Sequence, residues 1–459
     1  MRAQRIDRLG PEDMTILAAE ASGARMQFAA IVVLDGAPTL GEVRALLAAR
    51  IDAVPRLRQR LVRVPHGRPI WRGDPAFELA DHVVSLSCPS PGDRAALLAV
   101  TATIVEERLS LARSPWRIVV IGGLDPGSAG APSALVIVLH HVLADGLAGL
   151  AILSRLTDAP GPAAHSPVTL PPRTADRRRT GPRRWTDGAA RLHAGAVELL
   201  RDGTRGAPAC SINAGPVGPR RALGTARADL TPLIAAARAA GGTVNDVALT
   251  AVTGALDGHL RSRGERPDRL VVSIPITARR RAEIAELGNR TGVLPVSLPL
   301  VGSPRERLPV VAEITRTRKT ARPGASAAVY GPFARALAAV CAFGWFIGHQ
   351  RLVNTFVTNV RGPARPLTFA GHRIIELVPV SPVSGNVGVG FAVLSYAGRL
   401  SITVVADAER LPDVDRLAAL VQAQLDELRP APARTAGTAR SPGTSSESGP
   451  ARARGMPRP

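Results

Sequence analysis

The first 157 residues alternate between short apolar runs and longer stretches with helical spacing. Three runs are apolar and rich in β-branched residues, as expected of buried strands: 28–34, 116–122 and 134–140. Three stretches place apolar residues at the period of an α-helix: 40–54, 94–109 and 147–156. The pattern predicts a mixed α/β domain over residues 1–157.

The pattern then breaks off and later resumes. Residues 158–224 are rich in Pro, Gly and Arg, which predicts an exposed linker with one short helix at 188–201. Strands are predicted at 270–276, 293–300, 356–360, 373–379, 387–394 and 400–405. Helices are predicted at 231–240, 244–261, 313–319, 333–350 and 414–428. A second α/β domain is therefore expected over 225–429, followed by a disordered tail at 430–459.

The net charge of the chain indicates which partners its surface attracts. The formal net charge is +21, and of the 58 Lys and Arg residues only Lys319 is a lysine. Such a surface attracts anions, including phosphates and acidic lipid headgroups. Nucleic acid is the competing partner, but aromatic residues make up only 3% and no zinc-finger or RNA-binding aromatic motif is found.

Cysteine usage and hydropathy indicate in which cellular compartment the protein is expected. The three cysteines, Cys88, Cys210 and Cys341, are far apart and form no CxxC pair. A disulfide framework or a cysteine metal site is not expected, in keeping with a reducing cytoplasm. The charged N-terminus predicts no signal peptide. The apolar stretch 336–348 is too short to cross a bilayer, and either a buried helix or a segment that dips into a membrane surface fits it.

The most informative stretch is HHVLADG at 140–146, between a predicted strand and a predicted helix. Neighbours on a strand face opposite sides, so one histidine can face a cavity while the other packs inward. Imidazole suits a base that removes a hydroxyl proton and then protonates a leaving thiolate. Asp145 lies at the turn, and Gly146 permits an unusual backbone there. The alternative is a pair of core histidines with Asp145 as a helix cap.

The sequence lacks the motifs of two classes of hydrolase. The sequence contains no GxSxG elbow, which disfavours an α/β-hydrolase. It also contains no HExxH, so no zinc hydrolase and no metal site are predicted.

HHVLADG resembles the HHxxxDG signature of CoA-dependent acyltransferases, which include chloramphenicol acetyltransferases and peptide-synthetase condensation domains. Across residues 11–428 the chain is similar to the bacterial wax ester synthase/diacylglycerol acyltransferase family. The supporting segments are PEDMTILAAE, VPRLRQRLV, WRGDPAFELADHV, TVNDVALTAVTGAL, LGNRTGVLPVSLPL and TNVRGPARPLTFAGHRI. The resemblance implies two chloramphenicol-acetyltransferase-like domains joined by a linker, with an active-site tunnel at their interface.

The resemblance also implies residue roles. His141 is expected to be the general base and His140 to support it. Asp145 and Gly146 are expected to be structural.

The family's Asn-Asp pair falls on Asn245 and Asp246. Asn245 is expected to donate a hydrogen bond to the substrate carbonyl or its oxyanion, or to cap the following helix, and Asp246 to support it. Two segments depart from the family pattern: SPW at 114–116 stands for Pro-Leu-Trp, and NVRGP at 359–363 stands for Asn-Val-Pro-Gly-Pro. These departures leave acceptor specificity and the level of activity open.

The expected function is transfer of a long-chain acyl group from acyl-CoA to diacylglycerol, with wax ester formation from fatty alcohols as a second activity. Acyl-CoA is a co-substrate, and no cofactor is expected. The alternatives are acyl transfer to another lipid or polyketide hydroxyl and a weakly active lipid-binding or membrane-binding homologue. A cytoplasmic protein with peripheral contact to an anionic membrane or lipid-droplet surface is expected.

Overall fold

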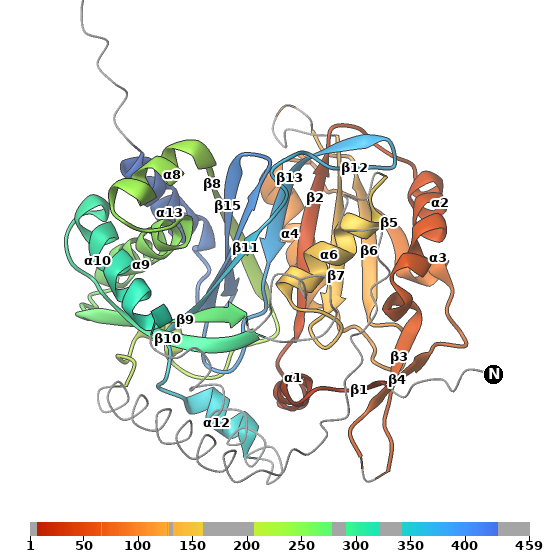
Figure 1. The fold of residues 1–459 in the computed structure, drawn as a ribbon, viewed down its shortest axis with the longest axis horizontal. Helices are drawn as coiled ribbons and strands as arrows, with labels where there is room; N and C mark the ends of the chain where they lie inside the picture. Colours follow the sequence, from red (N-terminus) through yellow and green to blue (C-terminus); the bar gives the residue numbers. More distant parts are fainter. Residues whose placement is uncertain are drawn as a thin grey trace, which may run out of the picture. The chain divides into compact units, whose positions relative to one another are not determined.

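A computed structural model describes residues 7–158, 206–277, 291–320 and 342–429, apart from 66, 126 and 128–131. Most of the predicted linker with its helix at 188–201, the predicted tail at 430–459, and Cys341 lie outside the described residues. The described part is built on two six-stranded sheets and one small three-stranded sheet (Figure 1).

The first large sheet carries the HHVLADG segment, and its strand order is β12-β13-β2-β7-β6-β5. Its strands are β2 (Gln27–Leu34), β5 (Val83–Ser87), β6 (Trp116–Gly122), β7 (Ser133–His140), β12 (Thr368–Phe369) and β13 (His372–Val380). Every residue of β7 is buried, because helices cover both faces of the sheet. Helices α2 (Leu40–Arg50) and α6 (Gly146–Leu156) pack on one face, and α4 (Arg94–Glu106) packs on the other.

The second large sheet has the order β10-β9-β11-β14-β15-β8. Its strands are β8 (Arg221–Asp229), β9 (Arg269–Thr277), β10 (Thr291–Pro299), β11 (Thr355–Arg361), β14 (Val389–Tyr396) and β15 (Arg399–Asp407). The helices of this half are α8 (Leu230–Ala239), α9 (Val244–Ser262), α10 (Pro304–Thr320) and α13 (Val414–Leu428). They form a layer over the sheet with α9 at its centre, where the side chains of most residues are buried (Figure 1).

The smaller elements lie outside the two large sheets. The strands β1 (Asp7–Arg8), β3 (Gln59–Val62) and β4 (Ile70–Gly73) form the three-stranded sheet. The short helices are α1 (Pro11–Ala21), α3 (Leu79–His82) and α12 (Phe343–His349), with 3-10 turns at Ile51–Ala53, Pro55–Arg58 and Ser211–Asn213. Helix α12 lies within the helix predicted at 333–350 but begins only at Phe343, with Ala342 as its N-cap, and residues 333–341 lie outside the described residues.

The observed elements depart from the predicted ones in several places, and β5, β12 and α3 are among the elements that were not predicted. Strand β8 begins at Arg221, so the last four residues assigned to the linker belong to the second sheet. Helix α10 begins at Pro304 instead of residue 313, with Pro309 inside it. Helix α1 and the three-stranded sheet had no counterpart among the predicted elements.

The two halves of the chain share one sheet. Strand β13 comes from the second half of the sequence, yet it pairs antiparallel with β2 and completes the first sheet. The turn before it is fixed by the Asp158 carboxylate, which accepts hydrogen bonds from the backbone N–H groups of Ala370 (2.9 Å) and Gly371 (2.7 Å). The described residues between Asp7 and Arg429 consequently form one compact unit.

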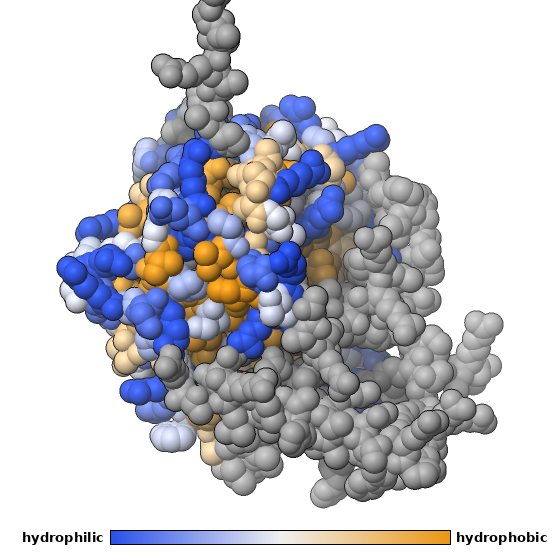
Figure 2. Space-filling view, turned by 60° about the vertical axis from the view of Figure 1, so that its left-hand side comes forward, coloured by the Kyte–Doolittle hydropathy of each residue, from blue (hydrophilic) through white to orange (hydrophobic). Residues whose placement is uncertain are grey.

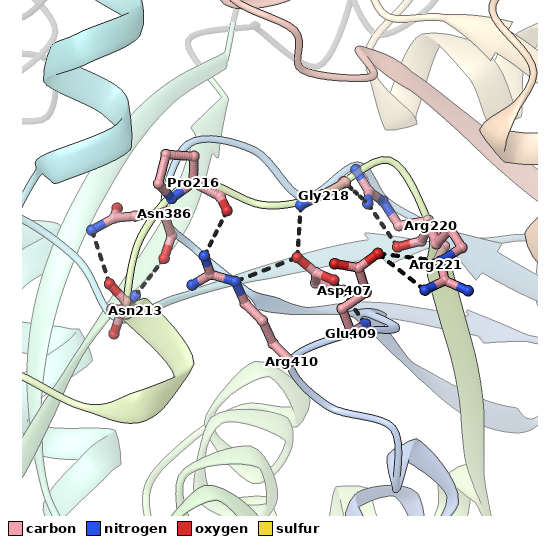
Figure 3. Close-up of polar contacts among 9 residues, drawn as sticks. All are labelled: Asn213, Pro216, Gly218, Arg220, Arg221, Asn386, Asp407, Glu409 and Arg410. Atoms are coloured by element: carbon pink, nitrogen blue, oxygen red, sulfur yellow. Dashed lines mark hydrogen bonds and ion pairs between the residues drawn. The ribbon is translucent and has the colours of Figure 1, made fainter.

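Side-chain contacts anchor the segment that leads into β8 (Figure 3). The Asp407 carboxylate accepts the Gly218 N–H at 2.7 Å, and Arg410 donates to the carbonyl of Pro216 at 2.6 Å. Asn213 donates to the carbonyl of Asn386 at 3.2 Å. These contacts fix where β8 starts along the edge of the second sheet.

The described residues contain no helix long and apolar enough to span a membrane. The face that carries α8, α9, α10 and α13 mixes hydrophilic residues with smaller hydrophobic areas (Figure 2). Cys88 and Cys210 are buried free thiols, and burial raises the pKa of Cys210 to about 11.

Candidate active site

The HHVLADG segment forms the turn between β7 and α6, as predicted. His140 ends β7 with its side chain fully buried. Its Nε2 lies 3.1 Å from the Glu20 carboxylate, and its Nδ1 accepts the N–H of Val142 at 3.2 Å. Because a backbone N–H can only donate, Nδ1 carries no proton, and the neutral ring holds its proton on Nε2. His140 is thus a hydrogen-bonded part of the interior.

His141 begins the turn and is partly exposed, which confirms the predicted difference in burial between the two histidines. Its backbone N–H donates to the carbonyl of Met26 at 2.8 Å. The imidazole packs edge-on against Phe28, with ring centroids 5.4 Å apart and an interplanar angle of 66°. Phe28 in turn lies against Gly149 of α6, where a Cβ would approach the Phe28 ring to 2.8 Å. The base predicted from the sequence therefore occupies a well-packed position with access to solvent.

Asp145 and Gly146 start α6. The Asp145 carboxylate is buried and accepts the Ala148 N–H at 2.9 Å, so Asp145 is the N-cap. The prediction that Gly146 supplies an unusual backbone is wrong, since its φ is not in the left-handed region. Gly146 is instead required by close packing, because a Cβ there would lie 3.1 Å from Val360 Cγ2 on β11.

Asn245 lies in the first turn of α9 and is not its cap, which is Thr243. Its Oδ1 accepts a hydrogen bond from Asn359 Nδ2 at 3.2 Å. Its own Nδ2 is buried and has no partner among the described residues. An unpaired buried amide is unfavourable by about 1–3 kcal/mol, so such groups call for an explanation.

Asp246 ties α9 to α10. Its Oδ2 accepts the backbone N–H of Thr243 at 2.7 Å and the hydroxyl of the same residue at 2.8 Å, a capping box. Its Oδ1 accepts the Thr315 hydroxyl at 2.6 Å. With both oxygens engaged, Asp246 holds the helix turn that carries Asn245.

Strand β11 contacts both motifs. Its neighbouring residues Asn359 and Val360 direct their side chains to opposite faces of the strand. Val360 packs against Gly146 at the start of α6, and Asn359 holds Asn245 at the start of α9. Two neighbouring residues of the NVRGP segment, Asn359 and Val360, thus contact the two predicted parts of the site.

The other departure from the family pattern supports the end of β7. The carbonyl of Pro115 accepts the His140 N–H at 3.0 Å, and Trp116 Nε1 donates to the carbonyl of Leu57 at 2.7 Å. The SPW sequence at 114–116 therefore keeps a backbone contact with the histidine pair.

Sequence reasoning assigned no role to three residues that touch the site: Glu20, Phe28 and Asn359. Glu20 and Asn359 occur in segments that carried the family resemblance, which was the available signal. No cluster of three or more His, Cys, Asp or Glu side chains suited to a metal occurs in the described ranges.

Comparison with known proteins gives a consistent result. Residues 9–248 match the model of the wax ester synthase/diacylglycerol acyltransferase catalytic domain, and residues 287–429 match the C-terminal domain of the same family. A Mycobacterium tuberculosis protein described as a probable diacylglycerol O-acyltransferase is 32% identical over 415 residues, which cover 85% of this chain and 88% of that protein.

Solved structures show the same fold. The wax ester synthase/diacylglycerol acyltransferase from Marinobacter aquaeolei VT8 has a TM-score of 0.67 at 23% identity, covering 92% of this chain and 98% of that one. The starter condensation domain of rhizomide synthetase, in complex with C8-CoA and Leu-SNAC, has a TM-score of 0.60 at 17% identity, covering 92% and 95%. These likenesses confirm the predicted α/β fold class. With the family matches on both segments, the chain belongs to the wax ester synthase/diacylglycerol acyltransferase family.

Proposed function

We propose that this protein transfers a long-chain acyl group from acyl-CoA to the hydroxyl of diacylglycerol, forming triacylglycerol and CoA, with fatty alcohols as second acceptors. The family match and the name of the mycobacterial relative support this reaction. The observation that carries it is the partly exposed His141 ring, fixed through Met26 and Phe28 at the end of β7.

His141 acts first as a base and then as an acid. Its imidazole takes the proton of the acceptor hydroxyl while the hydroxyl oxygen attacks the thioester carbonyl carbon. The C–S bond of the resulting tetrahedral intermediate breaks, and the imidazolium returns the proton to the CoA thiolate. The proton taken from the acceptor hydroxyl is thus returned to the CoA thiolate, and no acyl-enzyme intermediate forms. This role is supported by the difference in burial between His140 and His141.

Asn245 stabilises the oxyanion in this scheme. Its Nδ2 is a buried donor with no partner among the described residues, as expected of a group that donates a hydrogen bond to a substrate oxygen. Asn359 orients it by holding Oδ1, and Asp246 fixes the helix turn below it. His140, Asp145 and Gly146 position the turn that carries His141.

The reaction needs no group beyond its two substrates, because the thioester supplies the activated acyl group and His141 moves the proton. We therefore propose acyl-CoA as a co-substrate and no metal or organic cofactor. Exhaustive dialysis against EDTA should leave turnover unchanged, and a loss that zinc or magnesium restores would contradict this part of the proposal.

The lipid acceptor is drawn from a membrane or lipid-droplet surface, and we propose that the protein contacts that surface peripherally. A net charge of +21 favours anionic headgroups. Trp345 on α12 is 70% exposed and stacks on His349, an amphipathic arrangement typical of a membrane interface. Flotation with phosphatidylglycerol vesicles should exceed flotation with phosphatidylcholine vesicles, and Trp345→Ser should weaken it. Equal binding to both vesicles by both proteins would refute the contact.

The central experiment gives purified protein labelled acyl-CoA and detergent-dispersed diacylglycerol, and follows both triacylglycerol and free CoA thiol. His141→Ala should lower turnover by roughly 10²–10⁴-fold, the usual contribution of a general base. His372→Ala, a change at the start of β13 and at the opposite end of β2 from His140, serves as the matched control and should keep turnover. Wild-type turnover in folded His141→Ala would remove the mechanism. A fatty alcohol in place of diacylglycerol tests the second acceptor.

A further inference from the structure

We propose that Glu20 is a positioning residue of this site, which acts through His140 on the turn that carries His141. The inference deepens the proposed function and rests on the role of His141. Glu20 lies in the last turn of α1, 120 residues away from His140 in the sequence.

The two hydrogen-bond partners of the His140 ring determine which nitrogen carries its proton. The ring is fully buried, and its two nitrogens meet partners of opposite kind. The Val142 N–H requires an acceptor at Nδ1, and the Glu20 carboxylate requires a donor at Nε2. Only the neutral ring with its proton on Nε2 satisfies both partners. Glu20 therefore selects one tautomer of His140 through a charge-assisted hydrogen bond.

His140 in turn holds the backbone of the turn that carries His141. The backbone N–H groups of three consecutive residues all have acceptors: His141 donates to Met26, Val142 to His140 Nδ1, and Leu143 to the His140 carbonyl. His140 thus holds the two amides that follow His141, one with its ring and one with its backbone. Val142 is almost completely buried. If the ring proton moved to Nδ1, the Val142 N–H would face another donor and lose this acceptor.

Packing of α1 against α12 holds Glu20 in place. Helix α1 packs through Ala19 against Phe343 of α12. On the same contact, a Cβ at Gly344 would approach Ser22 Oγ to 2.5 Å, so only glycine allows α12 this close. The carboxylate reaches His140 from a helix with its own packing, so its position does not depend on the turn it controls.

The tautomer is measured directly in the wild-type protein. In a sample labelled with ¹⁵N histidine, two-bond ¹H–¹⁵N correlations distinguish a ring protonated at Nε2 from one protonated at Nδ1 or at both nitrogens. His140→Gln identifies the signal. We expect the Nε2–H tautomer at neutral pH. A ring protonated at Nδ1, alone or together with Nε2, would overturn the proposal, whatever the activity of any variant.

The kinetic test compares three variants. Glu20→Leu removes the acceptor and should lower kcat by roughly 10–100-fold with little change in KM, as when the outer hydrogen-bond partner of a functional histidine is lost. Glu20→Gln keeps a carbonyl acceptor and loses only the charge, so it should lower kcat by about threefold or less. Glu12→Leu is the matched control. It makes the same Glu-to-Leu change at an exposed position in the first turn of α1, and it should behave as wild type.

Each outcome has a distinct meaning. If Glu20→Gln is as impaired as Glu20→Leu, the negative charge and not the tautomer is required, and the proposal is wrong. Wild-type kcat in folded Glu20→Leu overturns it as well. If Glu20→Leu does not fold, the wild-type tautomer and the Glu20→Gln kinetics still decide. An inactive wild-type protein with the expected tautomer would refute the acyl transfer and not the role of Glu20 in the turn.

Discussion

Asn245 and His259 are both buried without complete hydrogen bonding, and their surroundings give them different meanings. The free Nδ2 of Asn245 belongs to a side chain oriented by Asn359, whose neighbour Val360 packs against Gly146. Both ring nitrogens of His259 lack partners among the described residues, and the ring lies on α9 amid the core of the second half. We propose that the first group serves the reaction, and we expect the second to make the stability of the protein depend on pH.

Asn245→Ala should lower kcat by about 10²–10³-fold, the usual loss when an oxyanion donor is removed. Asn359→Ala should cause a smaller loss, because the donor remains but is no longer oriented. Steady-state kinetics with diacylglycerol and acyl-CoA measure both. If Asn245→Ala raised KM and left kcat unchanged, its amide would bind the ground state and the transition state equally, and the oxyanion role would be wrong.

His259 should destabilise the protein as the pH falls. Burial lowers the pKa of this imidazole below its ordinary value of 6.5, and Arg263 and Arg416 lower it further. The unfolded chain then binds a proton more readily than the folded chain, so stability is complete above about pH 6.5 and decreases as the pH falls below it. Urea unfolding between about pH 7 and pH 5 measures this. The decrease should be smaller in His259→Leu, and equal slopes would contradict the assignment.

The site residues that could be predicted are those that lie in short, contiguous sequence motifs. His140, His141, Asp145 and Asn245 lie in short motifs at element boundaries, and the structure places them at those boundaries. Their partners could not be assigned, because Glu20 and Asn359 are 120 and 114 residues from the groups they bind. Hydrophobic periodicity is a local signal and does not report such pairings.

At the scale of elements, the sequence predicts best where a segment has one uniform environment. Strands β6 and β7 read as continuous apolar runs because both faces are covered, and α13 has a single apolar stripe. Strand β8 was missed because it lies at the sheet edge, with Arg, Gly and Thr among its residues. Pro309 concealed the first turns of α10, because proline usually ends a helical pattern.

Helix α9 offers a matched pair of glycines. A Cβ at Gly254 would lie 1.8 Å from Gln424 Oε1 and 2.2 Å from Arg307 Nη1, the contact that joins α9, α10 and α13. Gly254→Ala should therefore lower the free energy of unfolding by about 1–3 kcal/mol through overpacking.

Gly258→Ala is the control, since its Cβ meets Leu420 at an ordinary 3.6 Å. It should stabilise by about 0.5–1 kcal/mol through helix propensity. Chemical denaturation of both variants gives the comparison, and two effects of the same sign would contradict it.

At the scale of the whole described unit, an ion cluster joins the two halves. Arg94 on α4 donates two hydrogen bonds of 2.9 Å to the Glu376 carboxylate on β13, and Arg227 on β8 approaches the same carboxylate to 3.4 Å. The side chains of Arg94 and Glu376 are only 16% and 6% exposed. Because two arginines share one carboxylate, the cluster depends on Glu376.

Glu376→Leu should lower the free energy of unfolding by about 3–5 kcal/mol, because it leaves buried arginine charge without a partner. Adding Arg94→Met should recover part of the loss. Arg220→Met, which breaks an exposed pair with Glu409, should change stability by no more than about 1 kcal/mol. Urea titrations measure all three, and equal effects at the two pairs would refute the role of the cluster.

The pairing of β13 with β2 also constrains how the chain folds as it leaves the ribosome. Residues 1–157 carry the HHVLADG turn, but without β13 the β2 strand is an unpaired hydrophobic edge open to association with other chains. That edge stays open until residue 380 has been synthesised. A gene cut in the linker should therefore not yield an active N-terminal fragment, and co-expression of both pieces should be needed to recover soluble enzyme.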